Sequence, residues 1–219
     1  MNPRGRPRTF DRTAALDCAI ALFWEHGYDA VSMSQLTEAM GVSPPSLYAT
    51  FGDKQALFSE AVDAYAKRFG AYVSEALDEA PDSYGAARHL LTGAAAQHTM
   101  PDRPAGCLIL AGATNYTDSS VEVASELRTR RTDVADRLEN RITADIENGT
   151  LPCETDARGL AVYVITVWQG MSAAARDGHT RDNLLAVVAH ALDNWPGPKN
   201  VGIRQSSSSK TSSGPDSET

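Results

Sequence analysis

Three hydroxyl side chains lie close together in one short segment of the sequence and have the chemistry to bind DNA. They are Ser46, Tyr48 and Thr50. A phenol can donate to a phosphate oxygen, and the shorter hydroxyls can reach phosphates or base edges. Leu47 and Phe51 are four positions apart, so a helix there turns both toward a core. A short helix with an apolar back and a small, polar front suits entry into a major groove.

A pair of short helices separated by a tight turn is predicted around this segment. Ser32 and Gln35 have the spacing of a capping box, and Gly41 supplies the left-handed residue that ends many helices. Ser43 then caps a second helix with Pro44 at its first position, where the missing N–H costs nothing. The pattern is typical of a helix-turn-helix, although an ordinary pair of packed surface helices could carry the same caps.

A basic arm precedes the first predicted helix, which covers residues 11–26. Arg4, Arg6 and Arg8 have nothing to pack against, so we expect residues 1–10 to be mobile in the free protein. Arginines on such a leader can enter a narrow minor groove or bind phosphate. We therefore predict that the arm contacts DNA, with a solvated start that contacts nothing as the alternative.

A series of residues between positions 23 and 58 matches a known pattern in order and spacing. The residues are Phe23, Gly27, Tyr28, Ser32, Gly41, Val42, Ser43, Leu47, Tyr48, Phe51, Lys54, Leu57 and Phe58. By them the chain resembles the N-terminal domain of the tetracycline-repressor family. Members are all-helical homodimeric transcription regulators, usually repressors, whose divergent C-terminal domain binds a small molecule and thereby releases DNA. The resemblance implies that Ser46, Tyr48 and Thr50 occupy contact positions and that Lys54 starts the fourth helix near a phosphate.

The sequence departs from that family at Pro44-Pro45. The family more often has a longer side chain there, followed by glycine or another small residue. The two prolines remove two N–H donors and a possible base-reading side chain. Ser32, Ser43, Pro44 and Pro45 complete the set of predicted DNA contacts, and we expect phosphate contacts and DNA shape to carry more of the affinity than base readout.

The charge of the chain is acidic overall, with a net value of −8 at pH 7. Residues 1–54 hold five basic and six acidic side chains, so the predicted DNA reader is nearly neutral. A basic footprint must therefore be local: the arm, Lys54 and the helix N-termini. The chain has no apolar run that could span a bilayer, and the N-terminus lacks the apolar stretch of a secretory leader. A cytoplasmic protein with no membrane partner is expected.

Helical periodicity predicts an all-α fold throughout. The predicted organisation is a flexible basic arm at 1–10, a helix-turn-helix domain at 11–58, a helical ligand-binding and dimerisation domain at 59–195 and a disordered tail at 196–219. The fourth helix is predicted to run about 27 residues, ending near Pro81, with Tyr65, Phe69 and Tyr72 assigned to core packing. Further helices are expected over about 84–99, 107–116, 119–148, 155–177 and 180–195.

The last two predicted helices carry small and apolar residues that permit close helix approach. They could pair with a second copy as a four-helix bundle, as in the resembling family. A palindromic operator with two half-sites also requires a dimer. The alternative is that both helices only close the core of the monomer. The basic run Arg128–Arg131 is interpreted as a solvated face with i,i+4 partners rather than a second nucleic-acid patch.

The second domain is expected to bind the small-molecule ligand. Residues 106–111 look like a motif of one broad subgroup of the family, at the start of the helix that borders the ligand cavity in relatives. The candidate ligand-binding residues are Cys107, Asn115, Tyr116, Trp168 and Gln169. The sequence does not specify the identity of the small molecule.

Cysteine chemistry and catalysis supply the competing interpretations. Cys18, Cys107 and Cys153 show no metal-ligand spacing, so we expect reduced thiols and no metal site. We interpret Cys107 as a buried, inert thiol; the alternative is that a helix start lowers its pKa, which would make the protein a thiol-based redox-sensing repressor. Another is a DNA-independent dimeric small-molecule-binding protein. The chain contains none of the common catalytic or nucleotide-binding motifs, so neither an enzyme nor a cofactor is predicted.

Overall fold

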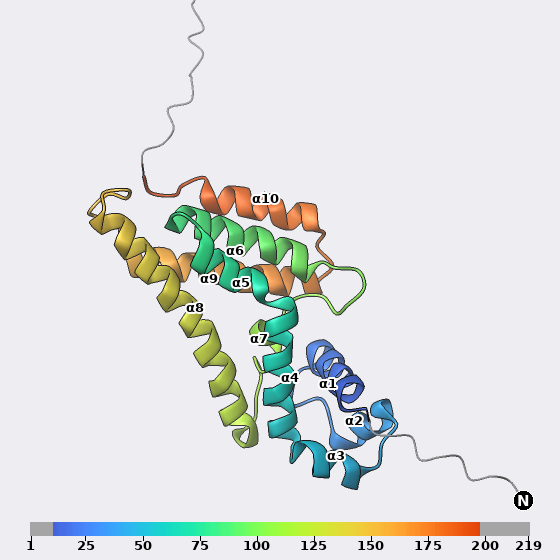
Figure 1. The fold of residues 1–219 in the computed structure, drawn as a ribbon. Coiled ribbons are helices and arrows are strands. Elements are labelled where there is room, and N and C mark those ends of the chain that lie inside the picture. Colours follow the sequence, from blue (N-terminus) through green and yellow to red (C-terminus); the bar gives the residue numbers. More distant parts are fainter. Residues whose placement is uncertain (1–10, 198–219) are drawn as a thin grey trace, which may run out of the picture.

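The computed structural model describes residues 11–197, in which a small helical bundle lies at one end of a larger helical body (Figure 1). The elements are α1 (Arg12–His26), α2 (Met33–Met40), α3 (Pro44–Phe51), α4 (Lys54–Phe69), α5 (Ala71–Glu79), α6 (Ser83–His98), α7 (Leu108–Ala111), the 3-10 helix η1 (Asp118–Ser120), α8 (Val121–Glu147), α9 (Ala157–Arg176) and α10 (Arg181–Leu192). The predicted all-α fold class is confirmed. The predicted arm and residues 198–219 of the predicted tail lie outside the described residues.

Aromatic side chains form the core of the small bundle. Phe23 and Phe58 are fully buried and meet edge to face, with ring centroids 5.0 Å apart. Tyr28 packs on Phe58 at the same centroid distance, and such aromatic pairs add to the stabilisation from burial alone. Because Phe58 belongs to α4, the first turns of that helix are part of the bundle, while its later turns reach the second domain.

The predicted fourth helix of about 27 residues is wrong, because the chain bends at Gly70 and divides it into α4 and α5. The Gly70 N–H donates to the Ala66 carbonyl at 3.0 Å. A Cβ atom on Gly70 would lie 2.7 Å from that same carbonyl oxygen, so the bend requires glycine. Apolar periodicity continues across the bend, which is why the pattern did not predict it. Downstream of Gly70, α5 packs against α6.

The helix predicted over 107–116 is also wrong, since only Leu108–Ala111 is helical. The following segment docks on the small bundle: the Gly112 carbonyl accepts from the Tyr28 N–H at 2.8 Å. Farther along, the Asp29 carboxylate accepts from the Thr117 N–H at 3.1 Å and from the Ser120 hydroxyl at 2.8 Å. Partners from the other domain therefore replace the hydrogen bonds that a continued helix would make.

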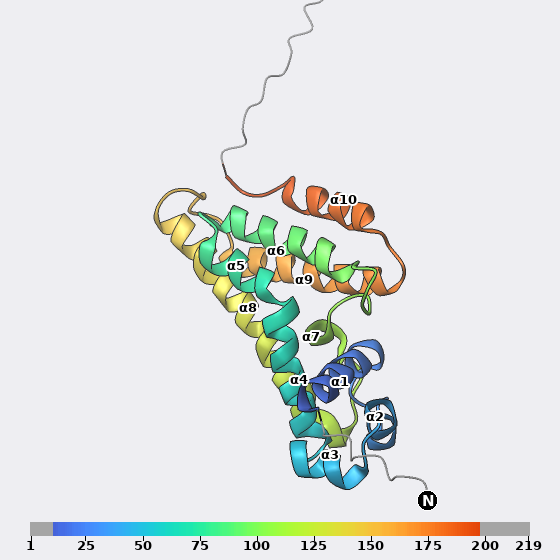
Figure 2. The same cartoon turned by 45° about the vertical axis from the view of Figure 1, so that its right-hand side comes forward.

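In the larger body, hydrogen bonds join α8 to α4, and α6 packs against both α9 and α10 (Figures 1 and 2). In α8 the buried residues Leu127, Leu138 and Ile142 follow helical spacing and form an apolar seam. No helix between residues 11 and 197 combines the length and apolar character needed to cross a bilayer.

Candidate nucleic-acid interface and ligand cavity

The helix-turn-helix has the predicted local geometry. The Ser32 hydroxyl accepts from the Gln35 N–H at 3.2 Å, and the Gln35 side chain accepts from the Ser32 N–H at 2.8 Å. Gly41 ends α2 with φ of 66° in the left-handed region. Ser43 accepts from the Ser46 N–H at 3.4 Å, with Pro44 as the first residue of α3. The predicted caps are therefore confirmed.

The α3 helix presents an apolar inner face and a polar outer face. Leu47 and Phe51 are buried. Ser46 and Tyr48 are exposed, whereas Thr50 is half-buried. Of the other predicted contacts on α2 and α3, the exposed residues are Ser32, Ser43, Pro44 and Pro45. The predicted positions thus lie on the outer side of the bundle, with the core holding α3 from behind.

Hydrogen bonds within α3 already use two of the three hydroxyls on its outer face. Thr50 donates to the Ser46 carbonyl at 2.8 Å. The Ser46 and Ser43 hydroxyls lie 2.9 Å apart, so one of them donates a hydrogen bond to the other. Tyr48 is 49% exposed, and its hydroxyl makes no hydrogen bond within the described part of the chain. Tyr48 is therefore the most available donor of the three for a phosphate.

Lys54 is the first residue of α4 and lies at the edge of this face. Its ammonium group sits 4.1 Å from the centroid of the Tyr28 ring, which is cation–π geometry. Partial burial lowers the pKa of Lys54, and the Asp29 carboxylate opposes that shift. The Tyr28 ring thus holds the Lys54 ammonium group in place. The family resemblance implies that a DNA phosphate lies near this position.

Two of the five predicted ligand-binding residues line a cavity of about 440 Å³, which we call the α4–α8 cavity. They are Cys107 and Trp168. Tyr65, Phe69 and Tyr72 pack against the core as predicted, and they also line this cavity. Periodicity detects the inward-facing stripe but does not distinguish a filled core from the wall of a cavity.

Hydrogen bonds between the polar atoms of aromatic side chains hold the walls of the α4–α8 cavity. The Trp168 Nε1–H donates to the Tyr72 hydroxyl oxygen at 3.0 Å. That oxygen lies 3.4 Å from His98 Nε2. Tyr65 and Cys107 lie near enough to each other to affect each other's pKa. Neutral polar groups are therefore fixed around a mainly apolar space, which is the usual composition of a small-molecule site.

The buried titratable groups around the α4–α8 cavity are uncharged at neutral pH. Burial raises the pKa of Tyr65, Tyr72 and Cys107, and it lowers the pKa of His98 to about 4. The direction of this shift agrees with a buried, inert thiol and argues against the alternative of a lowered Cys107 pKa. Although Cys107 is at the N-cap of α7, desolvation of the thiolate outweighs its hydrogen bonds and the nearby Arg131 charge.

Tyr116 and Gln169 line a different cavity, of about 580 Å³, which we call the junction cavity. It lies between the end of α1 and helices α7, α8 and α9. Asn115 is exposed and does not line either cavity. The tertiary structure thus divides the five predicted ligand residues between two separate spaces and the surface.

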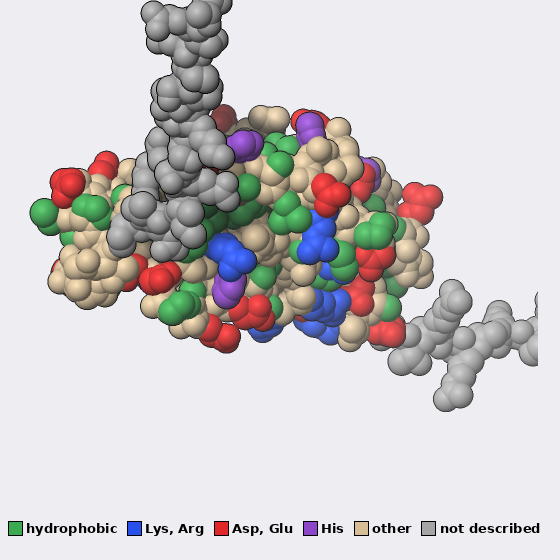
Figure 3. Space-filling model, turned by 90° about the horizontal axis from the view of Figure 1, so that it is seen from above, with side chains coloured by type: hydrophobic (Ala, Val, Ile, Leu, Met, Phe, Trp, Pro, Cys, Tyr) green, Lys and Arg blue, Asp and Glu red, His purple; other side chains and the backbone are tan. Residues whose placement is uncertain are grey.

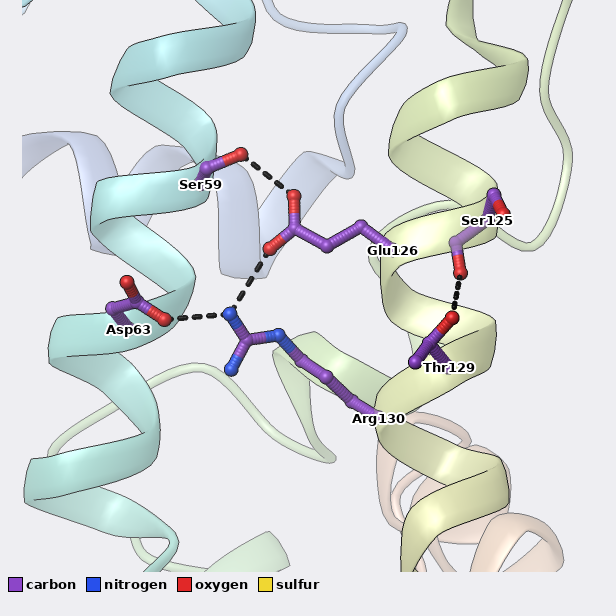
Figure 4. Close-up of polar contacts among 6 residues, drawn as sticks. All are labelled: Ser59, Asp63, Ser125, Glu126, Thr129 and Arg130. Atoms are coloured by element: carbon purple, nitrogen blue, oxygen red, sulfur yellow. Dashed lines mark hydrogen bonds and ion pairs between the residues drawn. The ribbon is translucent and has the colours of Figure 1, made fainter.

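A polar network joins α4 to α8 beside the α4–α8 cavity (Figure 4). Ser59 of α4 donates to Glu126 at 2.6 Å. Arg130 of α8 donates to Asp63 at 2.5 Å and to Glu126 at 3.0 Å, and it also lines the cavity. The wall of the cavity is therefore connected to the helix that begins in the small bundle. Within residues 11–197, no group of three or more His, Cys, Asp or Glu side chains is placed to hold a metal.

Two family models match the chain. Residues 15–61 match the model described as bacterial regulatory proteins, tetR family. Residues 85–192 match the model described as tetracyclin repressor-like, C-terminal domain. The first covers the small bundle and the second covers most of the larger helical body.

Similar proteins match over most of their length. The Escherichia coli K12 HTH-type transcriptional repressor ComR is 35% identical over 194 residues, which are 88% of this chain and 92% of ComR. The repressor BdcR of the same organism is 31% identical over 188 residues, 85% of this chain and 90% of BdcR. A solved structure of a cysteine mutant of the TetR family transcriptional regulator CifR with 26-base-pair operator DNA is 40% identical. Its TM-score is 0.81, and the match covers 87% of this chain and 100% of that chain.

Proposed function

Because this chain belongs to the TetR family of bacterial transcriptional regulators, we propose that it is a homodimeric repressor that binds a palindromic operator and is released by a small molecule. The observation that carries the proposal is the outer face of α3, which a capped turn and a buried core present to solvent. The similar repressors and the operator complex of CifR support the same conclusion.

The DNA contacts we propose are mostly to phosphates. Pro44 and Pro45 offer no N–H donors, and the Ser46 and Thr50 hydroxyls are engaged within α3. Tyr48 and Lys54 flank the helix and suit phosphate oxygens. Ser32 and Ser43 lie at helix N-termini, where anions are favoured. Contacts from the arm would add minor-groove or phosphate binding by Arg4, Arg6 and Arg8.

The dimer we propose forms through α9 and α10. Val162, Tyr163 and Val187 are between 42% and 45% exposed, so α9 and α10 together offer apolar surface that a second copy could cover. The face that carries α10 shows apolar side chains among charged ones (Figure 3). Two copies joined through these helices would bury that surface and place two α3 helices to read two half-sites.

The small molecule is proposed to bind in the α4–α8 cavity. The lining is mainly aromatic and apolar, and the charge of Arg130, its one arginine within residues 11–197, is already paired with Asp63 and Glu126, so the walls favour an uncharged ligand. Because α4 begins beside α3 and later lines the cavity, a ligand that displaces α4 would move the DNA-binding bundle. Such a regulator acts on chromosomal DNA, and we propose a cytoplasmic location accordingly.

Fluorescence anisotropy tests the DNA-binding proposal. The labelled DNA is the region immediately upstream of the gene for this protein, with scrambled DNA as the control, across a salt series. We expect selective binding that weakens with salt and is reduced by Tyr48→Ala. Tyr84→Ala is the matched control, because Tyr84 is similarly exposed at 42% but lies on α6. Equal, weak binding to both DNAs would instead favour the DNA-independent small-molecule-binding protein.

A further inference from the structure

We propose that the junction cavity binds a small oxyanion, namely a carboxylate or phosphate group carried by a metabolite. The cavity has a volume of about 580 Å³ and does not share a lining residue with the α4–α8 cavity. Three arginines face it: Arg128 and Arg131 from α8, and Arg176 from the end of α9. This site is separate from the proposed site for the uncharged ligand, so neither proposal depends on the other.

Carboxylates do not neutralise the three arginines. Within the described residues, Arg128, Arg131 and Arg176 have no ion pair, whereas the intervening Arg130 has two. Among residues 11–197, Asp177 is the only acidic side chain that lines the cavity, against three arginines. The wall is therefore locally cationic in a chain whose net charge is −8.

The like charges on α8 also repel each other. Arg128 and Arg131 are three positions apart, which places them on one face of the helix. The pKa of Arg131 is lowered, first by burial and then by the charge of Arg128. An anion between the two side chains would reduce their repulsion and offset the cost of burying Arg131, because it supplies opposite charge beside both guanidinium groups. The predicted solvated face is found at Arg128, which is exposed, but among the described residues of this run the predicted i,i+4 ion pair is made only by Arg130.

Neutral acceptors hold the guanidinium groups without cancelling their charge. Arg131 donates to the Ile109 carbonyl at 2.8 Å. Arg128 donates to the Tyr116 hydroxyl at 3.3 Å. Each guanidinium has five N–H donors, so several remain for a ligand. Oriented, unneutralised guanidinium groups are suited to bidentate recognition of carboxylate or phosphate.

The third arginine joins the cavity to the DNA-binding bundle. Arg176 donates to the carbonyls of Trp24 at 3.1 Å and Glu25 at 3.0 Å, which belong to the last turn of α1. A bound oxyanion shared by Arg176 and Arg131 would therefore connect α1 to α8. This contact gives the second site a direct physical link to the position of the helix-turn-helix.

Isothermal titration calorimetry of the full chain with citrate and with inorganic phosphate tests the proposal, at an ionic strength fixed with sodium chloride. We expect at least one of the two probes to bind wild-type protein, with citrate alone indicating carboxylate recognition and phosphate alone indicating phosphate recognition. Arg128→Gln and Arg131→Gln should each weaken binding at least tenfold. The matched control is Arg88→Gln, an exposed arginine on α6 that also lacks an ion pair among residues 11–197.

Lys54→Gln separates this site from the proposed phosphate contacts on the DNA-facing surface. If Lys54→Gln abolishes binding and Arg131→Gln leaves it intact, the anion binds at that surface and the proposal is overturned. Absence of heat beyond the chloride control, or equal affinities in wild type and Arg131→Gln, would overturn it as well. Circular-dichroism melting of each variant confirms that the comparison is made on folded protein.

Discussion

The Arg130 guanidinium lies 2.5 Å from the Asp63 carboxylate and thereby joins α8 to α4 (Figure 4), and Arg130 also lines the α4–α8 cavity. The two residues are 67 positions apart in the chain. Since α4 carries Phe58 in the core of the DNA-binding bundle, this ion pair connects that bundle to the wall of a cavity. Glu126 accepts from the same guanidinium and fixes its orientation.

A double-mutant cycle of Arg130→Met and Asp63→Asn measures this connection. We expect a coupling of roughly 0.5–1 kcal/mol in urea unfolding, because both side chains are partly solvated. The same cycle for the more exposed pair Arg158 and Asp136 should give a smaller coupling. Equal couplings for the two pairs would show that the network does not contribute specifically to the contact between α4 and α8.

The left-handed glycine in the turn of the helix-turn-helix gives a second prediction. Gly41 has φ of 66° and open space around its missing side chain, so Gly41→Ala should destabilise through backbone strain alone. The expected loss is about 1 kcal/mol in urea unfolding followed by circular dichroism. Gly170→Ala is the control, because Gly170 lies inside α9 and also has open space. Gly170→Ala should be neutral or stabilising, and an equal loss in both variants would contradict the turn geometry.

Removing the charge of Lys54 tests whether this residue contacts a DNA phosphate. Replacing Lys54 with Met should lower the slope of log affinity against log salt by about one, if its ammonium neutralises one phosphate. Lys67→Met makes the same charge change farther along α4, on an exposed side chain. The slope should not change in that control. Parallel changes in both variants would indicate a long-range effect of net charge instead of a local contact.

His98 makes stability depend on pH. Burial lowers its pKa to about 4 in the folded chain, from 6.5 when unfolded. The unfolded state therefore binds more protons between these values, and stability falls as pH decreases from about 6.5 to 4, by about 3 kcal/mol from this residue. Urea unfolding of wild type and His98→Gln across this range should show the difference. His89→Gln, on the exposed side of the same helix, should follow wild type.

The accessibility of the cysteines tests the alternative in which the protein is a redox-sensing repressor. Cys107 is buried with a raised pKa, while Cys153 is exposed. Iodoacetamide at pH 8 should modify Cys153 rapidly and Cys107 slowly, as followed by mass spectrometry of peptides. In urea the two rates should converge, which serves as the internal control. Rapid alkylation of Cys107 in the folded protein, together with peroxide-sensitive operator binding, would support a thiol sensor instead.

The sequence by itself predicted the features that depend on near neighbours. The predicted turn is confirmed by three local features, namely the capping box of Ser32 and Gln35, the left-handed Gly41 and the cap at Ser43. Each of these interactions closes within about four residues, so its chemistry is visible in a short window. The apolar spacing of Leu47 and Phe51 likewise set the inner face of α3, and with it the outer one.

Tertiary structure decided everything that required distant partners. The short α7 follows from the docking of Gly112 on Tyr28, and the bend at Gly70 interrupts an apolar pattern that runs across it. The division of the predicted ligand residues between two cavities depends on contacts between helices that are distant from one another in the sequence. The arginine cluster of the junction cavity also depends on Arg176, which comes from another helix. Periodicity reports which side of a helix faces inward, but only packing determines whether that side meets a core, a cavity or an unneutralised charge.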